Sequence, residues 1–249
     1  MKPVIVIPAR YKSERLPGKP LIELLGVSML RRTYAQCCKA LPASAVYVAT
    51  DDERIAGHCN EYGMQVVMTS GHCMTGTDRV AELANQIKAD VYINVQGDEP
   101  VLPPDDILKI VAAAELHPGE IINGVCRINS DEEDLYRSRT IPKVVMRPDG
   151  RLLYMSRSPI PGNKQDHFRQ GWRQVCIYAF PREPLQAFAS KNAKTPLEDL
   201  EDIEVLRFLE MGYEVRMSET SQQSIAVDIP EDIGRAEAAI RERGLEFLD

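Results

Sequence analysis

The sequence predicts an α/β fold: a mostly parallel central sheet with flanking helices, and a smaller lobe that contains a hairpin. Short β-branched runs alternate with helical segments in the first half, and an Asp149-Gly150 hairpin signal separates two apolar runs in the second. The 249 residues are enough for one large domain. We expect a single domain over 1–249, with a first half at about 1–120 and a second half at about 121–249.

The first half contains four apolar runs that predict parallel strands, at residues 4–7, 46–50, 65–68 and 91–95. Helices are predicted at 28–40 with Ser28 as the N-cap, at 78–87, and from Pro103 or Pro104 to about Leu116. Ligands of parallel sheets bind outside the carboxyl ends of the strands. The polar segments that follow Ile7, Thr50 and Val95 are therefore candidates for a site.

The second half is less regular. Its apolar runs predict strands at 121–128, 143–147, 152–156, 175–180, 215–218 and 225–227. Helices are predicted at 198–211 and 230–243. This hairpin-rich pattern indicates a lobe that binds a second ligand beside the parallel half.

The overall composition excludes several classes of function. A hydrophobic fraction of 44% and a charged fraction of 27% are typical of a soluble globular protein. The formal net charge of -7 argues against non-specific nucleic-acid binding. No apolar run approaches the roughly 18–20 residues that span a bilayer, and the N-terminal residues lack the apolar stretch of a signal peptide. We expect a cytoplasmic protein with no membrane or nucleic-acid partner.

The cysteines and histidines show no ligand spacing. None of the six cysteines forms a Cys-x-x-Cys motif, so we interpret them as buried, small apolar residues. The four histidines are scattered along the chain, and the aromatic residues are not arranged as a platform for stacked bases.

A basic loop follows the first predicted strand. Arg10, Lys12, Arg15 and Lys19 lie in it, and Gly18 permits close approach of the backbone to a ligand. Such side chains neutralise phosphates, although the loop is neither a Walker A nor a G-x-G-x-x-G motif. A solvated basic loop is the alternative. The position after a parallel strand favours a triphosphate site.

Two carboxylates follow apolar runs. Asp98 comes after the run at 91–95, and Asp228 after the run at 225–227. Mg²⁺ prefers one or two carboxylates together with substrate phosphates, so this pair is a candidate site for a magnesium–triphosphate complex. The alternative for each is a turn-forming or helix-capping aspartate.

A third element is the segment Thr75-Gly76-Thr77-Asp78-Arg79. Backbone N–H groups at a helix N-terminus suit an anionic nucleotide. The alternative is a plain helix start, with Thr77 as the N-cap and Asp78 in the first turn.

These elements, in this order, resemble the 3-deoxy-manno-octulosonate (Kdo) cytidylyltransferases, or CMP-Kdo synthetases. The similarity spans nearly the whole chain. It is carried by IPARYKSERLPGKPL, VATDD, TGTDRVAE, INVQGDEP, LYMSRSPIP, EDIEVLRFLEMG and VDIPEDI. It implies a nucleotidyltransferase fold like that of nucleotide-diphospho-sugar transferases, a homodimer, and the reaction of a sugar hydroxyl with the α-phosphate of CTP to give a CMP-sugar and pyrophosphate.

The resemblance also implies roles for residues. Arg10 and Lys19 would be catalytic and bind the triphosphate, and Asp98 and Asp228 would bind Mg²⁺. The nucleotide-binding set would be Ala9, Arg10, Arg15, Lys19, Thr75, Gly76, Asp78, Arg79 and Gln96. The small anionic acceptor would meet Arg157, Gln174, Tyr178 and Glu204.

The chain departs from the family pattern at the acceptor. Gln174 stands where the family carries the histidine of His-x-Gly-Ile-Tyr, and Val205 where it carries the glutamine of Glu-Gln-Leu-Arg. Lost hydrogen bonds to sugar hydroxyls would change selectivity. We therefore expect cytidylyl transfer to Kdo or a Kdo-like keto-sugar acid, with an amino-sugar acid or a phosphonate as the alternative acceptor.

Two further classes of protein compete with this interpretation. A nucleotide-sugar glycosyltransferase often carries an Asp-x-Asp metal motif, which Asp51-Asp52 is not. A non-catalytic nucleotide-sensing domain would be expected to lose Lys19, Asp98 or Asp228, and all three are present.

Overall fold

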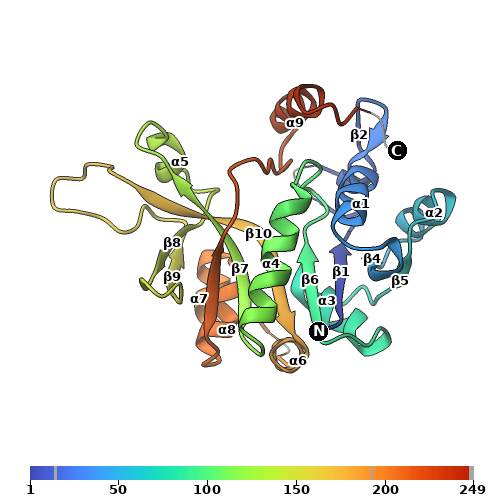
Figure 1. Ribbon diagram of the computed structural model, residues 1–249, viewed down its shortest axis with the longest axis horizontal. Coiled ribbons are helices and arrows are strands. Elements are labelled where there is room, and N and C mark those ends of the chain that lie inside the picture. Colours follow the sequence, from blue (N-terminus) through green and yellow to red (C-terminus); the bar gives the residue numbers. More distant parts are fainter. Residues whose placement is uncertain (14–15, 192, 247–249) are drawn as a thin grey trace. The chain divides into compact units, whose positions relative to one another are not determined.

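The computed structural model describes residues 1–13, 16–191 and 193–246. The chain forms two compact units (Figure 1). Unit 1 comprises Met1–Leu108 and Gln223–Asp249, and unit 2 comprises Lys109–Gln222. The sequence-based division placed everything after about residue 120 in one half. In the structure, the last segment of the chain belongs to unit 1 instead.

The core of unit 1 is a parallel sheet, as predicted. Its strands lie in the order β6 (Val91–Val95), β1 (Pro3–Pro8), β4 (Val46–Thr50) and β5 (Val66–Met68). β1, β4 and β6 are largely buried because their β-branched side chains pack on both faces of the sheet, whereas β5, at the edge, is half-buried to exposed. The prediction of an α/β fold is confirmed.

Four helices accompany this sheet: α1 (Met29–Ala40), α2 (Glu53–Glu61), α3 (Gly76–Gln86) and α9 (Pro230–Glu242). A short hairpin, β2 (Glu23–Leu24) and β3 (Val27–Ser28), precedes α1, and single 3₁₀ turns lie at η1 (Lys19–Leu21) and η2 (Ala43–Ala45). The Ser28 side chain accepts a hydrogen bond from the Arg31 N–H, so the predicted N-cap is confirmed.

The C-terminal segment packs on unit 1 through apolar and polar contacts. Ala236 and Ile240 of α9 join a buried cluster with Leu24 and Met29. The buried Arg32 guanidinium donates to the carbonyls of Leu24 and Leu245. The predicted strand at 225–227 does not form, because this segment makes a single bond, from the Val227 N–H to the Asp98 carbonyl, rather than a ladder.

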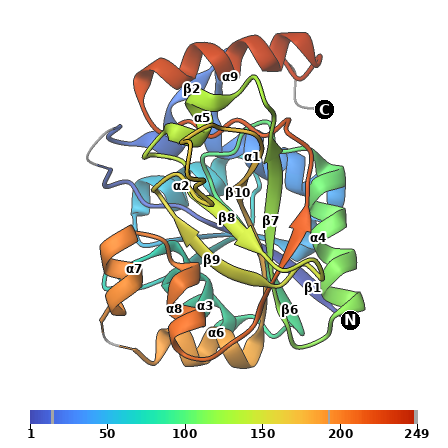
Figure 2. The ribbon, with the colours of Figure 1, turned by 90° about the vertical axis from the view of Figure 1, so that its left-hand side faces the viewer.

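The described part of unit 2 contains a group of strands that includes the long β7 and β10 (Figure 2). They are β7 (Ile121–Ile128), β8 (Lys143–Met146), β9 (Leu152–Ser156), β10 (Gly171–Pro181) and β11 (Val215–Glu219). β7 pairs with β11 in parallel and with β10 antiparallel, and β10 also pairs with β8, the first strand of the β8–β9 hairpin. An isolated bridge between Arg151 and Arg216 joins β9 back to β11.

The helices of unit 2 are α5 (Glu133–Arg137), α6 (Arg182–Ala189), α7 (Pro196–Glu201) and α8 (Val205–Glu210), and α4 (Pro104–Leu116) begins in unit 1 and ends in unit 2. The prediction of one helix over 198–211 is wrong. Asp202 adopts a left-handed conformation with φ 51° and ends α7. The Arg157 guanidinium donates to the freed carbonyls of Glu201 and Asp202, which stabilises the break.

All six cysteines are free thiols. Cys37, Cys59 and Cys126 are buried, as the interpretation required, whereas Cys38, Cys73 and Cys176 are half-buried. Over the described residues, the structure contains no helix with the length and apolar character of a membrane span.

Candidate functional site

Three predicted residues of unit 1 meet at one point. The Lys19 ammonium lies 2.5 Å from Asp98 Oδ2 and 3.2 Å from Asp228 Oδ1. Lys19 and Asp98 are largely buried, whereas 44% of the Asp228 side chain is exposed. In the sequence, Lys19 lies 79 positions before Asp98 and 209 positions before Asp228. In the structure, the three side chains form one ionic cluster.

Local backbone structure produces this convergence. Gly18 has φ 69°, a conformation that costs glycine little, and its N–H bonds to the Tyr11 carbonyl, so the basic loop returns to place Lys19 at the start of η1. The bond from Val227 to the Asp98 carbonyl places the next residue, Asp228, beside Asp98. Asp228 is not the N-cap of α9, which is Ile229; the carboxylate of Asp232, in the first turn, accepts from the N–H groups of Asp228 and Ile229.

Electrostatics favour the charged form of Lys19. Burial alone would lower the pKa of Lys19, but the charges and hydrogen bonds of Asp98, and then of Asp228, outweigh burial and raise that pKa above the ordinary value. The lysine is therefore held as a cation between the two carboxylates.

The cluster fits the chemistry of a hard divalent cation. Two carboxylates reach the same point, and Mg²⁺ is held by one or two carboxylates together with substrate phosphates. Across the described parts of the chain, no three His, Cys, Asp or Glu side chains gather as a complete metal cage. The donor set therefore suits a cation that a phosphate ligand completes.

The predicted nucleotide turn lies at the start of α3. Thr75 is the N-cap in place of the expected Thr77, and it forms a capping box with Asp78, whose N–H lies 3.2 Å from Thr75 Oγ1. A Cβ atom added to Gly76 would lie 3.3 Å from Gln96 Nε2. Thr75, Gly76, Asp78 and Gln96 are therefore close together, which the sequence implied only through the resemblance.

Arg79 is held by residues that the sequence reasoning did not single out. It is buried, its guanidinium lies 3.1 Å from Asp51 Oδ1, and it donates to Thr69 Oγ1. The buried Asn94 was also missed: its Oδ1 lies 3.5 Å from Gln96 Nε2, and its own Nδ2 has no hydrogen-bond partner within the described structure. A buried, unpaired amide was detectable only from the coordinates.

The remaining predicted nucleotide residues are placed as follows. Ala9 is buried, and its N–H donates to the Ala49 carbonyl. Arg10 is exposed at the end of β1. Arg15 lies outside the described residues.

A polar network in unit 2 surrounds Gln174, one of the predicted acceptor residues. Its Nε2 donates to Asn123 Oδ1 at 3.0 Å and to Tyr178 Oη at 3.2 Å. In a regular strand, Gln174 and Tyr178 would lie about 13 Å apart. A bulge in β10 between Val175 and Tyr178 shortens this distance, so the two side chains can bond. Asn123 Nδ2 donates to the carbonyls of Val175 and Ile177, which stabilises the bulge.

This network fixes the orientation of both amides. Because the Asn123 nitrogen is bound to two carbonyls, its oxygen faces Gln174. Gln174 must then present its nitrogen, and both hydrogens of that nitrogen are engaged. Among the described contacts of this amide, Gln174 Oε1 is the atom left to meet a ligand, and it is an acceptor.

The other predicted acceptor residues surround the break between α7 and α8. The Arg157 guanidinium donates to the carbonyls of Glu201, Asp202 and Thr140, and the Glu201 carboxylate accepts from the Arg157 N–H. Glu204 is half-buried and precedes α8. Val205, which replaces the family glutamine, is buried.

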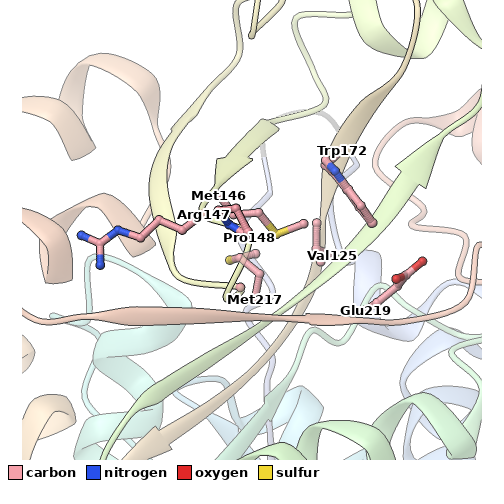
Figure 3. Close-up of a pocket in the computed structure, with 8 residues that line it drawn as sticks. Val125, Met146, Arg147, Pro148, Trp172, Met217 and Glu219 are labelled. Atoms are coloured by element: carbon pink, nitrogen blue, oxygen red, sulfur yellow. The ribbon is translucent and has the colours of Figure 1, made fainter.

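A cavity of about 400 Å³ lies elsewhere in unit 2 (Figure 3). It is lined mainly by apolar side chains: Val125, Met146, Pro148, Trp172 and Met217. None of the predicted site residues lines it. Arg147 and Glu219 are the charged residues of its lining.

Comparisons with known proteins identify the family. Residues 4–222 match the model of the cytidylyltransferase family. The chain is 42% identical to 3-deoxy-manno-octulosonate cytidylyltransferase of Geobacter metallireducens, over 94% of this chain and 96% of that protein. It is 37% identical to 8-amino-3,8-dideoxy-manno-octulosonate cytidylyltransferase of Shewanella halifaxensis, over 96% and 99% of the two chains.

A solved structure shows the same fold. CMP:2-keto-3-deoxy-manno-octonic acid synthetase, in complex with CTP, superposes with a TM-score of 0.89 at 33% identity, over 98% of this chain and 100% of that one.

Proposed function

The chain belongs to the cytidylyltransferase family and is a CTP-dependent cytidylyltransferase, and from this we propose that it transfers CMP to Kdo. The anomeric hydroxyl of the acid loses its proton and forms a bond to the α-phosphorus of CTP, while the bond to pyrophosphate breaks. The supporting observation is the Lys19 ammonium held between Asp98 and Asp228 next to a basic loop. This cluster supplies both signs of charge that a metal–triphosphate complex needs.

The residues of unit 1 have distinct roles in this proposal. Lys19 exchanges its carboxylate partners for phosphate oxygens, and Arg10 and Arg15 add positive charge. Asp98 and Asp228 would hold Mg²⁺, which when bound neutralises phosphate oxygens. The cytidine would lie against the nucleotide-binding residues Ala9, Thr75, Gly76, Asp78, Arg79 and Gln96.

The acceptor side supports a second candidate, the 8-amino analogue of Kdo. Gln174, Tyr178 and Glu204 would meet the sugar. The free Gln174 Oε1 accepts a hydrogen bond, so it suits an amine as well as a hydroxyl. A relative from Shewanella named for the 8-amino acid is almost as similar as those named for Kdo.

The test is pyrophosphate release with CTP and Mg²⁺, with Kdo, its 8-amino analogue and a phosphonate compared as acceptors. We expect turnover of an octulosonate. If the 8-amino acid is the substrate, its kcat/KM should exceed that of Kdo by roughly ten- to a hundred-fold, and Gln174→His/Val205→Gln should reduce the difference. Efficient use of Kdo by the wild type, with no gain in the double variant, excludes the second candidate.

The homodimer stays a prediction of the resemblance, and the cytoplasmic location stays a prediction from the sequence. Sedimentation of the purified protein at several concentrations measures the oligomeric state directly.

A further inference from the structure

Three basic residues of unit 2 lie beside the β8–β9 hairpin, whose course can be followed in Figure 2. Lys143 begins β8 and pairs with Ser156 at the end of β9, so Arg157 adjoins it. Arg139 lies four residues before Lys143, and its carbonyl is 3.4 Å from Arg157 Nη1. The three residues therefore form one basic cluster: Arg139, Lys143 and Arg157.

Two members of the basic cluster are bound to backbone carbonyls. The Lys143 ammonium donates to the carbonyls of Ser138, Ile141 and Arg157. The Arg157 guanidinium donates on all three nitrogens to carbonyl oxygens, as described above. These bonds join the segment before β8 to the residues after β9. Because their N–H groups are used in this way, neither cation presents a pair of N–H groups for a bidentate bond to a ligand carboxylate.

Arg139 differs from both. Its side chain is exposed, and within the described parts of the chain its guanidinium donates only to Ser158 Oγ, at 2.7 Å. No carboxylate pairs with it there. Arg137, two residues earlier, shows the contrast, because its guanidinium is 2.7 Å from Glu133 Oε1 and also contacts Asp166.

The basic cluster has two carboxylates beside it, Glu201 and Asp202: Asp202 Oδ2 is 3.7 Å from Arg157 Nη2, and Asp202 is shared with Lys194. Burial, followed by the charges of Arg139 and Arg157, lowers the pKa of Lys143 to about 8. Glu201 opposes this effect, but its carboxylate is already bound by Ser156, Tyr154 and the Arg157 N–H. An anion at Arg139 would reduce the repulsion among the three cations.

The basic cluster also adjoins the polar network of the predicted acceptor site. The Gln174 N–H donates to the Pro142 carbonyl at 3.0 Å, and Arg173 is the register partner of Lys143. The segment that carries Arg139 therefore lies directly beside Gln174.

We propose that Arg139 and Ser158 bind the carboxylate of the acceptor, and that Arg157 is a positioning residue that holds the Arg139 backbone in place. This inference rests on the proposed function, since it assigns the acidic group of that reaction's acceptor. Arg139 lies outside the motifs from which the acceptor site was predicted, whereas Ser158 follows Arg157 in LYMSRSPIP.

The experiment measures steady-state kinetics of Arg139→Ala with the octulosonate that the wild type uses. Charge-assisted hydrogen bonds of this kind account for roughly ten- to a hundred-fold in binding. We expect the KM for the acid to rise by that factor, with kcat and the Kd for CTP little changed. Arg139→Lys should recover part of the loss, and Ser158→Ala should cause a smaller rise. Arg137→Ala, the matched control, should behave as the wild type.

An unchanged KM for the acid in Arg139→Ala, with an active wild type, overturns the inference and leaves the proposed function intact. A loss confined to kcat or to CTP binding overturns it as well. Absence of pyrophosphate release by the wild type with every octulosonate contradicts the proposed function itself, and the inference with it. Thermal unfolding of each variant verifies that the fold is retained.

Discussion

Replacement of Lys19 by methionine tests the ionic cluster of unit 1. The change removes the ammonium and keeps an unbranched side chain of similar length. The largely buried contact with Asp98 contributes about 1.5–3 kcal/mol, and the half-exposed contact with Asp228 adds about 0–1 kcal/mol. We therefore expect Lys19→Met to lower the free energy of unfolding by about 2–3 kcal/mol, which corresponds to roughly 5–10 °C in Tm for a chain of this size.

The pH dependence of this stabilisation has a defined sign. Because the pKa of Lys19 is raised in the folded state, the contribution is fully present below the ordinary lysine pKa. It is lost only as the pH rises through the still higher pKa of the folded protein. The difference in Tm between wild type and Lys19→Met should therefore be constant across the neutral range and disappear at strongly alkaline pH.

Addition of Mg²⁺ without nucleotide provides the second readout. In the wild type the cation must compete with the ammonium for Asp98 and Asp228, whereas in Lys19→Met this competitor is absent. We expect Mg²⁺ to raise the Tm of Lys19→Met more than that of the wild type, and an added Asp228→Asn change to remove the effect. Lys39→Met is the control, since Lys39 is exposed and has no ion pair in the described structure.

Scanning calorimetry gives these values, and pyrophosphate release gives the activity, which should fall by orders of magnitude in Lys19→Met. The reasoning is refuted if Lys19→Met is as stable as the wild type. Equal stabilisation of both proteins by Mg²⁺ refutes the cation site.

Two further predictions concern unit 2. Glu198 and Arg207 form a fully buried ion pair at 2.6 Å. Glu198→Ala should lower the free energy of unfolding in denaturant by about 3–5 kcal/mol, whereas Glu198→Met/Arg207→Leu should recover most of this loss. Similar losses in both variants would contradict this prediction. Burial lowers the pKa of Lys143 to about 8, so above that pH the unfolded chain binds more protons than the folded one. The free energy of unfolding should therefore rise with pH above about 8 in the wild type but not in Lys143→Met. Parallel pH profiles of unfolding in the two proteins would show the assignment to be wrong.

The sequence predicted the parallel core because its signals are local. β4 and β6 begin and end where short apolar runs do, and Ser28 precedes α1 with a side chain that can cap it. Each of these signals lies within a few residues of the element it defines, so no knowledge of the tertiary structure was needed.

The failures involve partners that are distant in the sequence. No glycine or proline marks the break at Asp202, which depends on a guanidinium 45 residues away. The segment at 225–227 has the composition of a strand, but only the Asp98 carbonyl is available to it. The sequence likewise gave Arg79 a ligand-binding role without indicating that Asp51 and Thr69 hold it.

The two ends of the proposed acceptor site make complementary demands on a ligand. Gln174 offers only an acceptor, because Asn123 and Tyr178 engage both hydrogens of its amide. A carboxylate or phosphonate oxygen facing Gln174 would be repelled, whereas a hydroxyl or amine would be bound. Arg139 and Ser158 offer donors and positive charge. An acid with donor groups along its chain therefore has one favourable direction of binding, with its carboxylate at Arg139 and a hydroxyl or amine at Gln174.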